Sequence, residues 1–147
     1  MNRKFFTPQI IPRESKVNST GKLTFFEGIE DFPFPIHRSF WISGVPEGAN
    51  RGVHAHKKET QLLICLQGSV RVELEDLSET KFSFHLPDAD HALFIPPMTW
   101  SSVYFGPDVL LLVLSDQPYD EEDYIRSKEE FQILQNLHLK DDTYGSK

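Results

Sequence analysis

Two histidines, His54 and His56, stand two positions apart in a segment that otherwise reads as a β-strand. Alternate side chains of a strand lie on the same face, so we expect both imidazoles on one face, with Cα atoms about 6–7 Å apart. Arg51 precedes the pair, Lys57 follows it, and an apolar run begins after Gln61. Because histidine exchanges protons near neutral pH, this strand carries candidate acid–base groups.

Short strand-like segments separated by turn residues recur along the chain and predict a β-sandwich or jelly roll. The expected strands are residues 4–12, 22–27, 36–43, 51–57, 61–66, 69–75, 81–86, 93–95, 99–105 and 109–114. The first of them contains Pro8, which favours an edge strand or an arm. Residues 32–35 (FPFP) are expected to be extended, because each proline disfavours helix at the residue before it.

Near the C-terminus the spacing of apolar residues changes from that of a strand to that of a helix. Asp120 is the expected helix N-cap, with Asp123 at the capping-box position. The apolar residues near one face of this helix are Tyr124, Ile125, Phe131, Leu134 and Leu137. We predict a single domain over residues 1–137, with an N-terminal strand arm and a C-terminal helix, followed by a polar, frayed tail over residues 138–147.

Composition excludes several classes of protein. A net charge of −7 over 147 residues argues against a general nucleic-acid binder, although one basic pocket can still hold a nucleotide. No apolar run approaches the roughly 18 residues of a membrane span, and the N-terminal segment lacks a signal-peptide pattern. The single cysteine, Cys65, is expected as a buried thiol, which suits a reducing compartment. We therefore expect a cytoplasmic protein.

The spacing around the histidines resembles the first motif of the cupin superfamily: Gly, five residues, His-x-His, three or four residues, Glu, six residues, Gly. The positions that fit are Gly48, His54, His56 and Gly68. Gln61 takes the place of the superfamily's metal-binding Glu. The resemblance implies an all-β cupin jelly roll.

The second cupin motif, Pro-x-Gly-x-x-His, corresponds to residues 95–105, where the His register falls on Ser101 or Ser102. Two of the four expected metal ligands are therefore missing, including the only anionic one. Two imidazoles alone make a poor site for a first-row metal. We interpret the histidine pair as acid–base or binding groups and expect neither a metal nor another cofactor.

Three segments carry a more specific pattern: residues 21–38 (Gly-x-Leu, a Glu, then Pro-Phe-x-Ile-x-Arg), residues 51–74 (RGVHAHKKETQLLICLQGSVRVEL) and residues 119–131 (YDEEDYIRSKEEF). Together they resemble the sugar 3,4-ketoisomerases (WxcM-like proteins) that act on dTDP-4-keto-6-deoxyglucose in deoxysugar and 3-amino sugar biosynthesis. The resemblance implies a metal-free homodimer with exchanged N-terminal strands, which binds a dTDP-linked sugar inside the barrel.

This chain departs from that family at two places. The family often has Tyr-Tyr or Phe-Tyr where this chain has Phe40 and Trp41, and some members have a His where it has Ser101. If a family tyrosine assists the proton shuttle, this chain needs another donor, for which Tyr104 is a candidate.

The reaction that the resemblance implies moves a ketone from C4 to C3 through an enediol. It needs a base near both carbons and a proton donor for the enolate oxygen. Our hypothesis assigns the carbon proton to His56 in preference to His54, which would polarise the ketone or handle the oxygen proton. The order of these two roles stays open, as does the galacto or gluco configuration of the product at C4.

Eight further residues are candidates for substrate binding: Arg38, Arg51, Lys57, Gln61, Trp100, Tyr104, Tyr124 and Arg126. Arg38 and Arg51 can each hold a pyrophosphate through charge-assisted hydrogen bonds, or can form a surface ion pair instead. Trp100 can stack on thymine or the sugar, or pack in the core, and Lys57 can be solvated. Gln61 can bond a histidine or a sugar hydroxyl.

Rival functions remain. A nucleotide-sugar-binding cupin without turnover would bind the ligand and form no isomer, and the Phe40 and Ser101 departures motivate it. A metal-dependent cupin enzyme would carry stoichiometric metal. Epimerisation at C3 and C5, found in a related cupin family, is disfavoured by the Arg-Gly-x-His-Ala-His-Lys-Lys segment.

Overall fold

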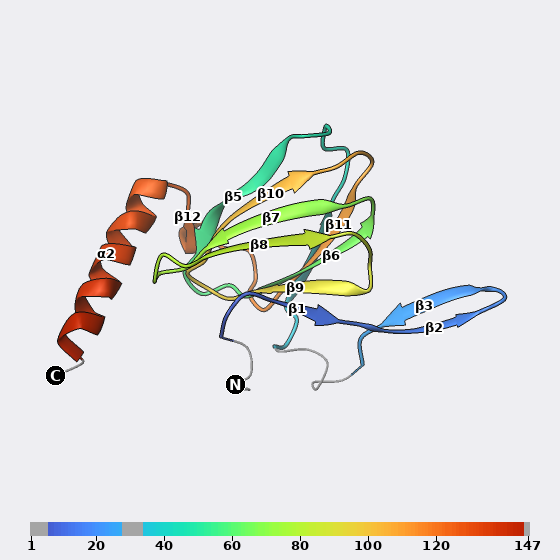
Figure 1. Cartoon of the computed structure of the whole chain (residues 1–147), viewed down its shortest axis with the longest axis horizontal. Coiled ribbons are helices and arrows are strands. Elements are labelled where there is room, and N and C mark those ends of the chain that lie inside the picture. The colour runs from blue at the N-terminus through green and yellow to red at the C-terminus, as the bar shows by residue number, and fades with distance from the viewer. Residues whose placement is uncertain (1–5, 28–33, 146–147) are drawn as a thin grey trace.

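The computed structural model describes residues 6–27 and 34–145, and these form twelve strands, one 3-10 helix and one α-helix (Figure 1). Three segments with a predicted structure fall partly outside this range: residues 4–5 of the first expected strand, residues 32–33 of the extended FPFP segment and residues 146–147 of the expected tail. Among the described residues, no helix is both long enough and apolar enough to span a membrane.

Two antiparallel five-stranded sheets make up the body. The first sheet contains, in spatial order, β1 (Gln9–Pro12), β9 (His91–Ile95), β6 (Gln61–Gln67), β11 (Leu110–Ser115) and β4 (Arg38–Ile42). The second contains β12 (Tyr124–Ile125), β5 (Asn50–His56), β10 (Trp100–Phe105), β7 (Val70–Glu75) and β8 (Lys81–Leu86). The predicted all-β architecture with a C-terminal helix is confirmed.

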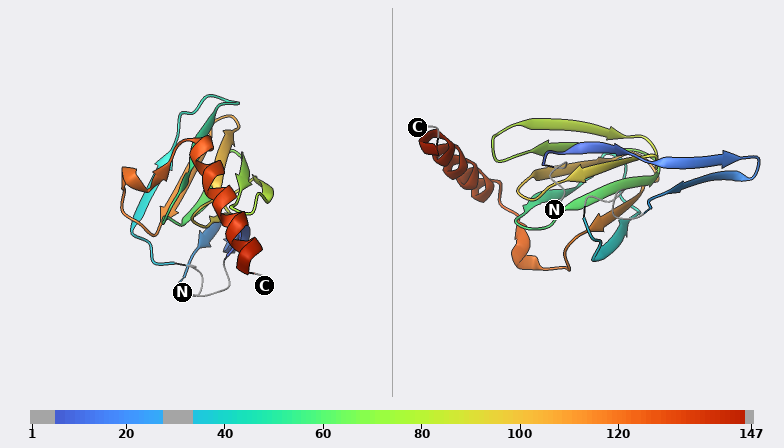
Figure 2. Two further views of the ribbon diagram at one scale, coloured as in Figure 1. Left: turned by 90° about the vertical axis from the view of Figure 1, so that its left-hand side faces the viewer. Right: turned by 90° about the horizontal axis from the view of Figure 1, so that it is seen from below.

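A hairpin of β2 (Glu14–Asn18) and β3 (Gly21–Phe25) forms a separate two-stranded sheet that projects from the body. The hairpin and helix α2 (Lys128–Gly145) lie at opposite ends of the molecule, as both Figure 1 and the right-hand view of Figure 2 show. The sequence analysis did not predict β2, because its side chains are all exposed and have no alternation for burial to impose.

The main core lies between the two sheets, where inward-facing side chains of both meet. It includes Leu63, Cys65, Val70, Val72, Leu74, Leu93, Val103, Phe105, Leu111 and Val113. A second cluster covers the other face of the first sheet and includes Leu62, Ile64, Phe94 and Leu114, with Ile11 and Phe34. β6 is therefore buried on both faces, which explains its unbroken apolar sequence.

The C-terminal segment differs from its prediction. Asp120 caps only the short 3-10 helix η1 (Glu121–Asp123), and the chain then pairs with β5 as β12. The α-helix begins at Lys128 and continues through residues 138–145, where the sequence analysis expected a frayed tail. Residues 124–125 are strand because the open edge of β5 satisfies their backbone groups, which outweighs the local helix-start signal. The limits of the domain stay a prediction.

Candidate active site

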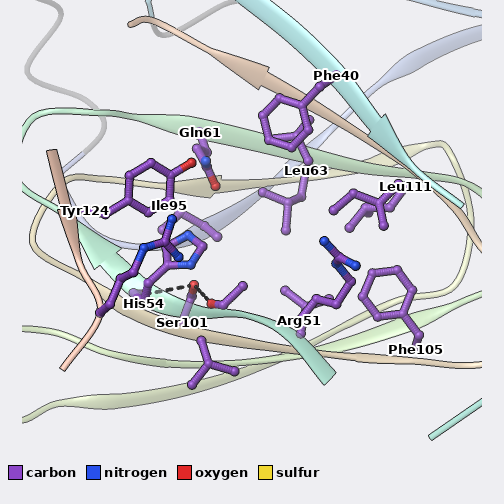
Figure 3. Close-up of a pocket in the computed structure, with 16 residues that line it drawn as sticks. Phe40, Arg51, His54, Gln61, Leu63, Ile95, Ser101, Phe105, Leu111 and Tyr124 are labelled. Atoms are coloured by element: carbon purple, nitrogen blue, oxygen red, sulfur yellow. Dashed lines mark hydrogen bonds between the residues drawn. The ribbon is translucent and has the colours of Figure 1, made fainter. Parts of the chain in front are cut away.

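A cavity of about 300 Å³ opens between the two sheets. Its polar lining consists of Arg51, His54, Gln61, Ser101, Tyr124 and Arg126. Figure 3 shows labelled side chains from β4, β5, β6, β10, β11 and β12 around this space, with Phe40, Leu63 and Leu111 on its apolar side. The cavity therefore joins an apolar wall to a small group of convergent polar side chains, which is the usual form of a small-molecule site.

His54 is the half-buried imidazole of this lining. It pairs in register with Ser101 of β10, whose hydroxyl donates to the carbonyl oxygens of Gly52 at 2.7 Å and His54 at 3.2 Å. Burial, together with the charges of His56 and Arg126, lowers the pKa of His54 to about 4 against the opposing effect of Glu59 and Glu121. At neutral pH this imidazole is uncharged and can accept a proton.

His56 lies behind His54 and does not line the cavity. The two rings are 4.8 Å apart, as expected for neighbours on one strand face. His56 is 7% exposed, and both of its ring nitrogens face carboxylates: Nδ1 lies 3.3 Å from Asp123 Oδ2, and Nε2 lies 3.0 Å from Glu59 Oε2. Its position is that of a buried, fully engaged group.

Glu59 is the residue that the sequence analysis missed. Its buried carboxylate accepts hydrogen bonds from Arg38 Nη2 at 2.6 Å, from Gln61 Nε2 at 2.8 Å and from the Ser115 hydroxyl. Burial raises the pKa of Glu59, but the hydrogen bonds from His56 and Ser115 and the charges of His56 and Arg38 outweigh it and leave the pKa lowered. Glu59 is thus an anion surrounded by donors.

The tyrosine of β12, Tyr124, lines the cavity beside both histidines, with ring centroids 4.9 Å from His54 and 4.3 Å from His56. Burial and the charge of Glu59 raise its pKa, so its hydroxyl keeps its proton at neutral pH and can donate it. The sequence analysis placed Tyr124 in a helix turn, and the strand is what directs it into the cavity.

Two arginines line the cavity and are exposed to solvent. Arg126 packs over the Tyr124 ring at 4.2 Å and makes a two-pronged pair with Glu121, at 2.7 and 3.0 Å. The hydrogen bonds from Arg126 lower the pKa of Glu121 to about 2. In the described part of the chain Arg51 forms no ion pair, and its exposed guanidinium lines the cavity, where it can bind a ligand.

Four of the predicted binding residues do not line the cavity. Arg38 is occupied by Glu59, by the carbonyl oxygen of Gln117 at 3.4 Å and by the rings of Phe40 and Tyr119. The other three are Lys57, Trp100 and Tyr104.

The two aromatic residues of this group are kept from the cavity by strand alternation. Trp100 and Tyr104 alternate with Ser101 and Val103 and so point to the opposite face of β10. Trp100 packs against Phe131 of α2, with ring centroids 5.8 Å apart. Tyr104 packs against Arg71. Tyr104 is therefore not placed to replace a missing active-site tyrosine.

The donor set offers little to a metal ion. Across residues 6–27 and 34–145, no group of three or more His, Cys, Asp or Glu side chains is arranged to hold one. Gln61 contributes a neutral amide to the cavity, and the nearby carboxylate of Glu59 is already bonded to protein donors.

Known proteins with similar sequence and structure are sugar-nucleotide isomerases. A family model described as FdtA: WxcM-like, C-terminal matches residues 7–136. The chain is 35% identical over 124 residues to the TDP-4-oxo-6-deoxy-alpha-D-glucose-3,4-oxoisomerase of Aneurinibacillus thermoaerophilus, which covers 84% of this chain and 88% of that protein.

Two solved structures share the fold over most of their length. QdtA, a sugar 3,4-ketoisomerase from Thermoanaerobacterium thermosaccharolyticum in complex with TDP, matches with a TM-score of 0.80 and 35% identity, over 86% of this chain and 92% of QdtA. A 3,4-ketoisomerase from Helicobacter canadensis matches with a TM-score of 0.82 and 32% identity, over 88% of this chain and 97% of that one.

Proposed function

This chain belongs to the FdtA family of WxcM-like proteins and is an isomerase with a cupin jelly-roll fold, and from that premise we propose that it moves the ketone of TDP-4-keto-6-deoxyglucose from C4 to C3. The observation that carries the proposal is His54, an uncharged imidazole that lines the cavity beside the hydroxyl-bearing Tyr124. Relatives named as TDP-sugar 3,4-ketoisomerases support the substrate class.

In the proposed reaction a ring nitrogen of His54 takes the proton from C3, while Tyr124 donates its phenolic proton to the C4 oxygen. This gives an enediol. The C3 hydroxyl then returns its proton to Tyr124, and His54 delivers a proton to C4. The C3–H and O3–H bonds are broken, the C4–H and O4–H bonds are formed, and no net oxidation occurs. The carbon proton is thus assigned to His54 and not to His56, because His54 is the histidine that lines the cavity.

The two cavity arginines supply the anion-binding half of the proposal. Arg51 and Arg126 can each donate two hydrogen bonds to a diphosphate, and guanidinium groups suit this geometry. Tyr124 under Arg126 offers a ring face, and Gln61 offers an amide for a sugar hydroxyl. These contacts would hold the nucleotide while the sugar reaches His54.

We further propose that the protein is a homodimer and that it resides in the cytoplasm. In this structure β1 pairs with β9 of its own chain. A homodimer with exchanged N-terminal strands would place the same pairing between two copies. Light scattering of the purified protein would test it, since a monomeric mass would contradict the dimer. Residence in the cytoplasm stays a prediction.

The test of the reaction is proton NMR of the purified protein with fresh TDP-4-keto-6-deoxyglucose in D₂O containing EDTA. We expect new 3-keto sugar signals and deuterium at the exchanged carbons, and the coupling at C4 will distinguish galacto from gluco product. His54→Asn should abolish both changes, whereas the control His85→Asn, at an exposed position of β8, should not. An unchanged spectrum despite binding seen by calorimetry would identify a binding module without turnover.

A further inference from the structure

Strand β5 brings into the cavity two side chains that a regular strand would point in opposite directions. Arg51 and His54 are three positions apart, and successive side chains of a strand alternate between its faces, yet both line the cavity. The proposed function uses the first for the diphosphate and the second at the sugar. We propose, on the basis of that function, that Ser101 is a positioning residue, whose hydroxyl holds an irregularity of β5 that brings Arg51 and His54 to one face.

The irregularity is a β-bulge in the pairing of β5 with β10. Two residues of β5, Gly52 and Val53, stand against a single residue of β10, Ser102. Gly52 has a φ of 65°, in the left-handed region, as in the form of bulge whose first residue is a glycine. One extra residue reverses the alternation of the strand beyond it. The side chains on either side of the bulge, Arg51 and His54, therefore share the cavity face.

Ser101 holds this bulge from the neighbouring strand. Its hydroxyl donates to the carbonyl oxygen of Gly52 at 2.7 Å, inside the bulge, and to that of His54 at 3.2 Å, at its end. A bulge interrupts the regular ladder of backbone hydrogen bonds, and a backbone group left without a partner away from water is costly. The hydroxyl supplies a partner that only the bulged backbone needs, so it favours the bulge over a regular pairing.

The contacts of Ser101 distinguish this role from direct contact with a ligand. Ser101 lines the cavity, but in the described part of the chain its hydroxyl bonds to β5 alone, so its proton is not offered to the sugar. Gly52 is the residue that permits the bulge. A Cβ atom there would meet no atom closer than 3.8 Å, so the left-handed φ is the feature that calls for glycine.

Calorimetry with TDP tests whether Ser101 acts through Arg51. Ser101→Ala removes the hydrogen bonds to the bulge and should weaken TDP binding by about 3- to 10-fold. In an Arg51→Gln background the same substitution should change the affinity by less than about twofold, because the group that Ser101 positions is absent. If the hydroxyl instead bound the ligand directly, Ser101→Ala would weaken binding equally in both backgrounds, which would contradict the inference.

The adjacent serine provides a matched control. Ser102 points to the opposite face of β10, where it lines a separate hollow with Trp100 and Glu75. Ser102→Ala makes the same chemical change one residue along the same strand, so it should leave both TDP affinity and kcat at their wild-type values. A loss equal to that of Ser101→Ala would show a general weakening of β10 and would contradict a specific role for Ser101.

Turnover supplies a second readout. The kcat of Ser101→Ala should fall by about 10-fold or more, because a shifted bulge displaces His54 from the reacting atoms. Ser101→Thr keeps a hydroxyl at the same position and should restore both kcat and TDP affinity. Gly52→Ala disfavours the left-handed φ without a steric clash, so it should lower both quantities as Ser101→Ala does.

These outcomes separate the inference from the proposed function. A wild type that binds TDP and forms no isomer would refute the proposed function, and the binding measurements would still decide the role of Ser101. If the wild type is active, wild-type affinity and kcat in Ser101→Ala, or a Ser101→Thr variant as impaired as Ser101→Ala, would refute the positioning role.

A crystal structure of the wild type with TDP decides the matter even if the variants fail to fold. The Ser101 hydroxyl should lie within hydrogen-bonding distance of the Gly52 carbonyl oxygen, with Arg51 in contact with the diphosphate. A Ser101 hydroxyl bonded to the ligand instead of to β5 would overturn the inference.

Discussion

Acidification provides the sharpest test of His54 as the base. Its pKa is lowered to about 4, first by burial and then by the charges of His56 and Arg126. A base must be unprotonated to accept the C3 proton, so the rate should follow the neutral fraction of this imidazole. An ordinary solvated histidine would already lose that form below its usual pKa of about 6.5.

The size of the difference can be worked out at pH 5.5. With a pKa near 4, about 97% of His54 is neutral, whereas with a pKa near 6.5 only about 9% would be, which is roughly a tenfold difference in rate. We therefore expect kcat/KM at pH 5.5 to remain close to its value at pH 7.5 and to fall by half only near pH 4.

The assay is the initial rate of deuterium incorporation, measured from pH 4 to pH 8 at constant ionic strength. Folding must be followed at each pH by tryptophan fluorescence. The unfolded imidazole binds its proton near pH 6.5 and the folded one only near pH 4, so the unfolded state holds more protons in that window and stability falls as pH decreases through it. A half-maximal rate near pH 6.5 in a protein that is still folded would refute the reasoning.

Three substitutions test the remaining contacts. Arg51→Gln should weaken TDP binding by about 1.5–3 kcal/mol in calorimetry, and an unchanged affinity would show that the diphosphate binds elsewhere. Phe131→Ala, at a fully buried position against Trp100, should cost about 3–5 kcal/mol in urea unfolding, and an unchanged midpoint would contradict the packing of α2. Ser115→Ala removes one donor to buried Glu59 and should cost about 1–3 kcal/mol by the same assay; a neutral effect would mean that Arg38 and Gln61 satisfy the carboxylate without the hydroxyl.

Most of the sheet architecture could be predicted from local pattern. Val70, Val72 and Leu74 alternate with charged residues, and the structure buries all three between the sheets, because the side-chain period of a strand is two. The apolar run of β6 was equally informative, since only a strand covered on both faces carries such a sequence. Arg51 and His54 both line the cavity although they are three residues apart in β5, so alternation alone does not place them there. A register shift of β5 against Ser101–Val103, with Gly52 at a φ of 65°, brings the two side chains to the same face.

The local sequence pattern did not predict the positions of Asp123, Tyr124 and Glu59, because contacts between residues far apart in the sequence determine them. Asp123 has the residue type and position of a helix capping box, yet its carboxylate bonds the turn after β5, more than 60 residues away in sequence. Tyr124 accordingly enters the cavity from a strand. Glu59 lies in an irregular turn, where no period assigns its side chain to a face. The sequence signal that could have identified it is a carboxylate residue three positions after the histidine pair.

Glu59 and Gln61 together explain how this cavity can carry a neutral base. Gln61 lines the cavity and presents an amide, whereas Glu59, two residues earlier, lies behind it and accepts hydrogen bonds from Arg38 and Ser115. If the carboxylate lay in the cavity at position 61, its charge would raise the pKa of His54 and repel a diphosphate. The carboxylate of Glu59 instead lies behind His56, where it accepts hydrogen bonds from protein donors and its negative charge stabilises the fold. The polar residues that face the ligand are therefore neutral or cationic. A Gln61→Glu variant should therefore raise the pKa of His54 and weaken TDP binding together, whereas a change in only one of the two would separate the base from the anion site.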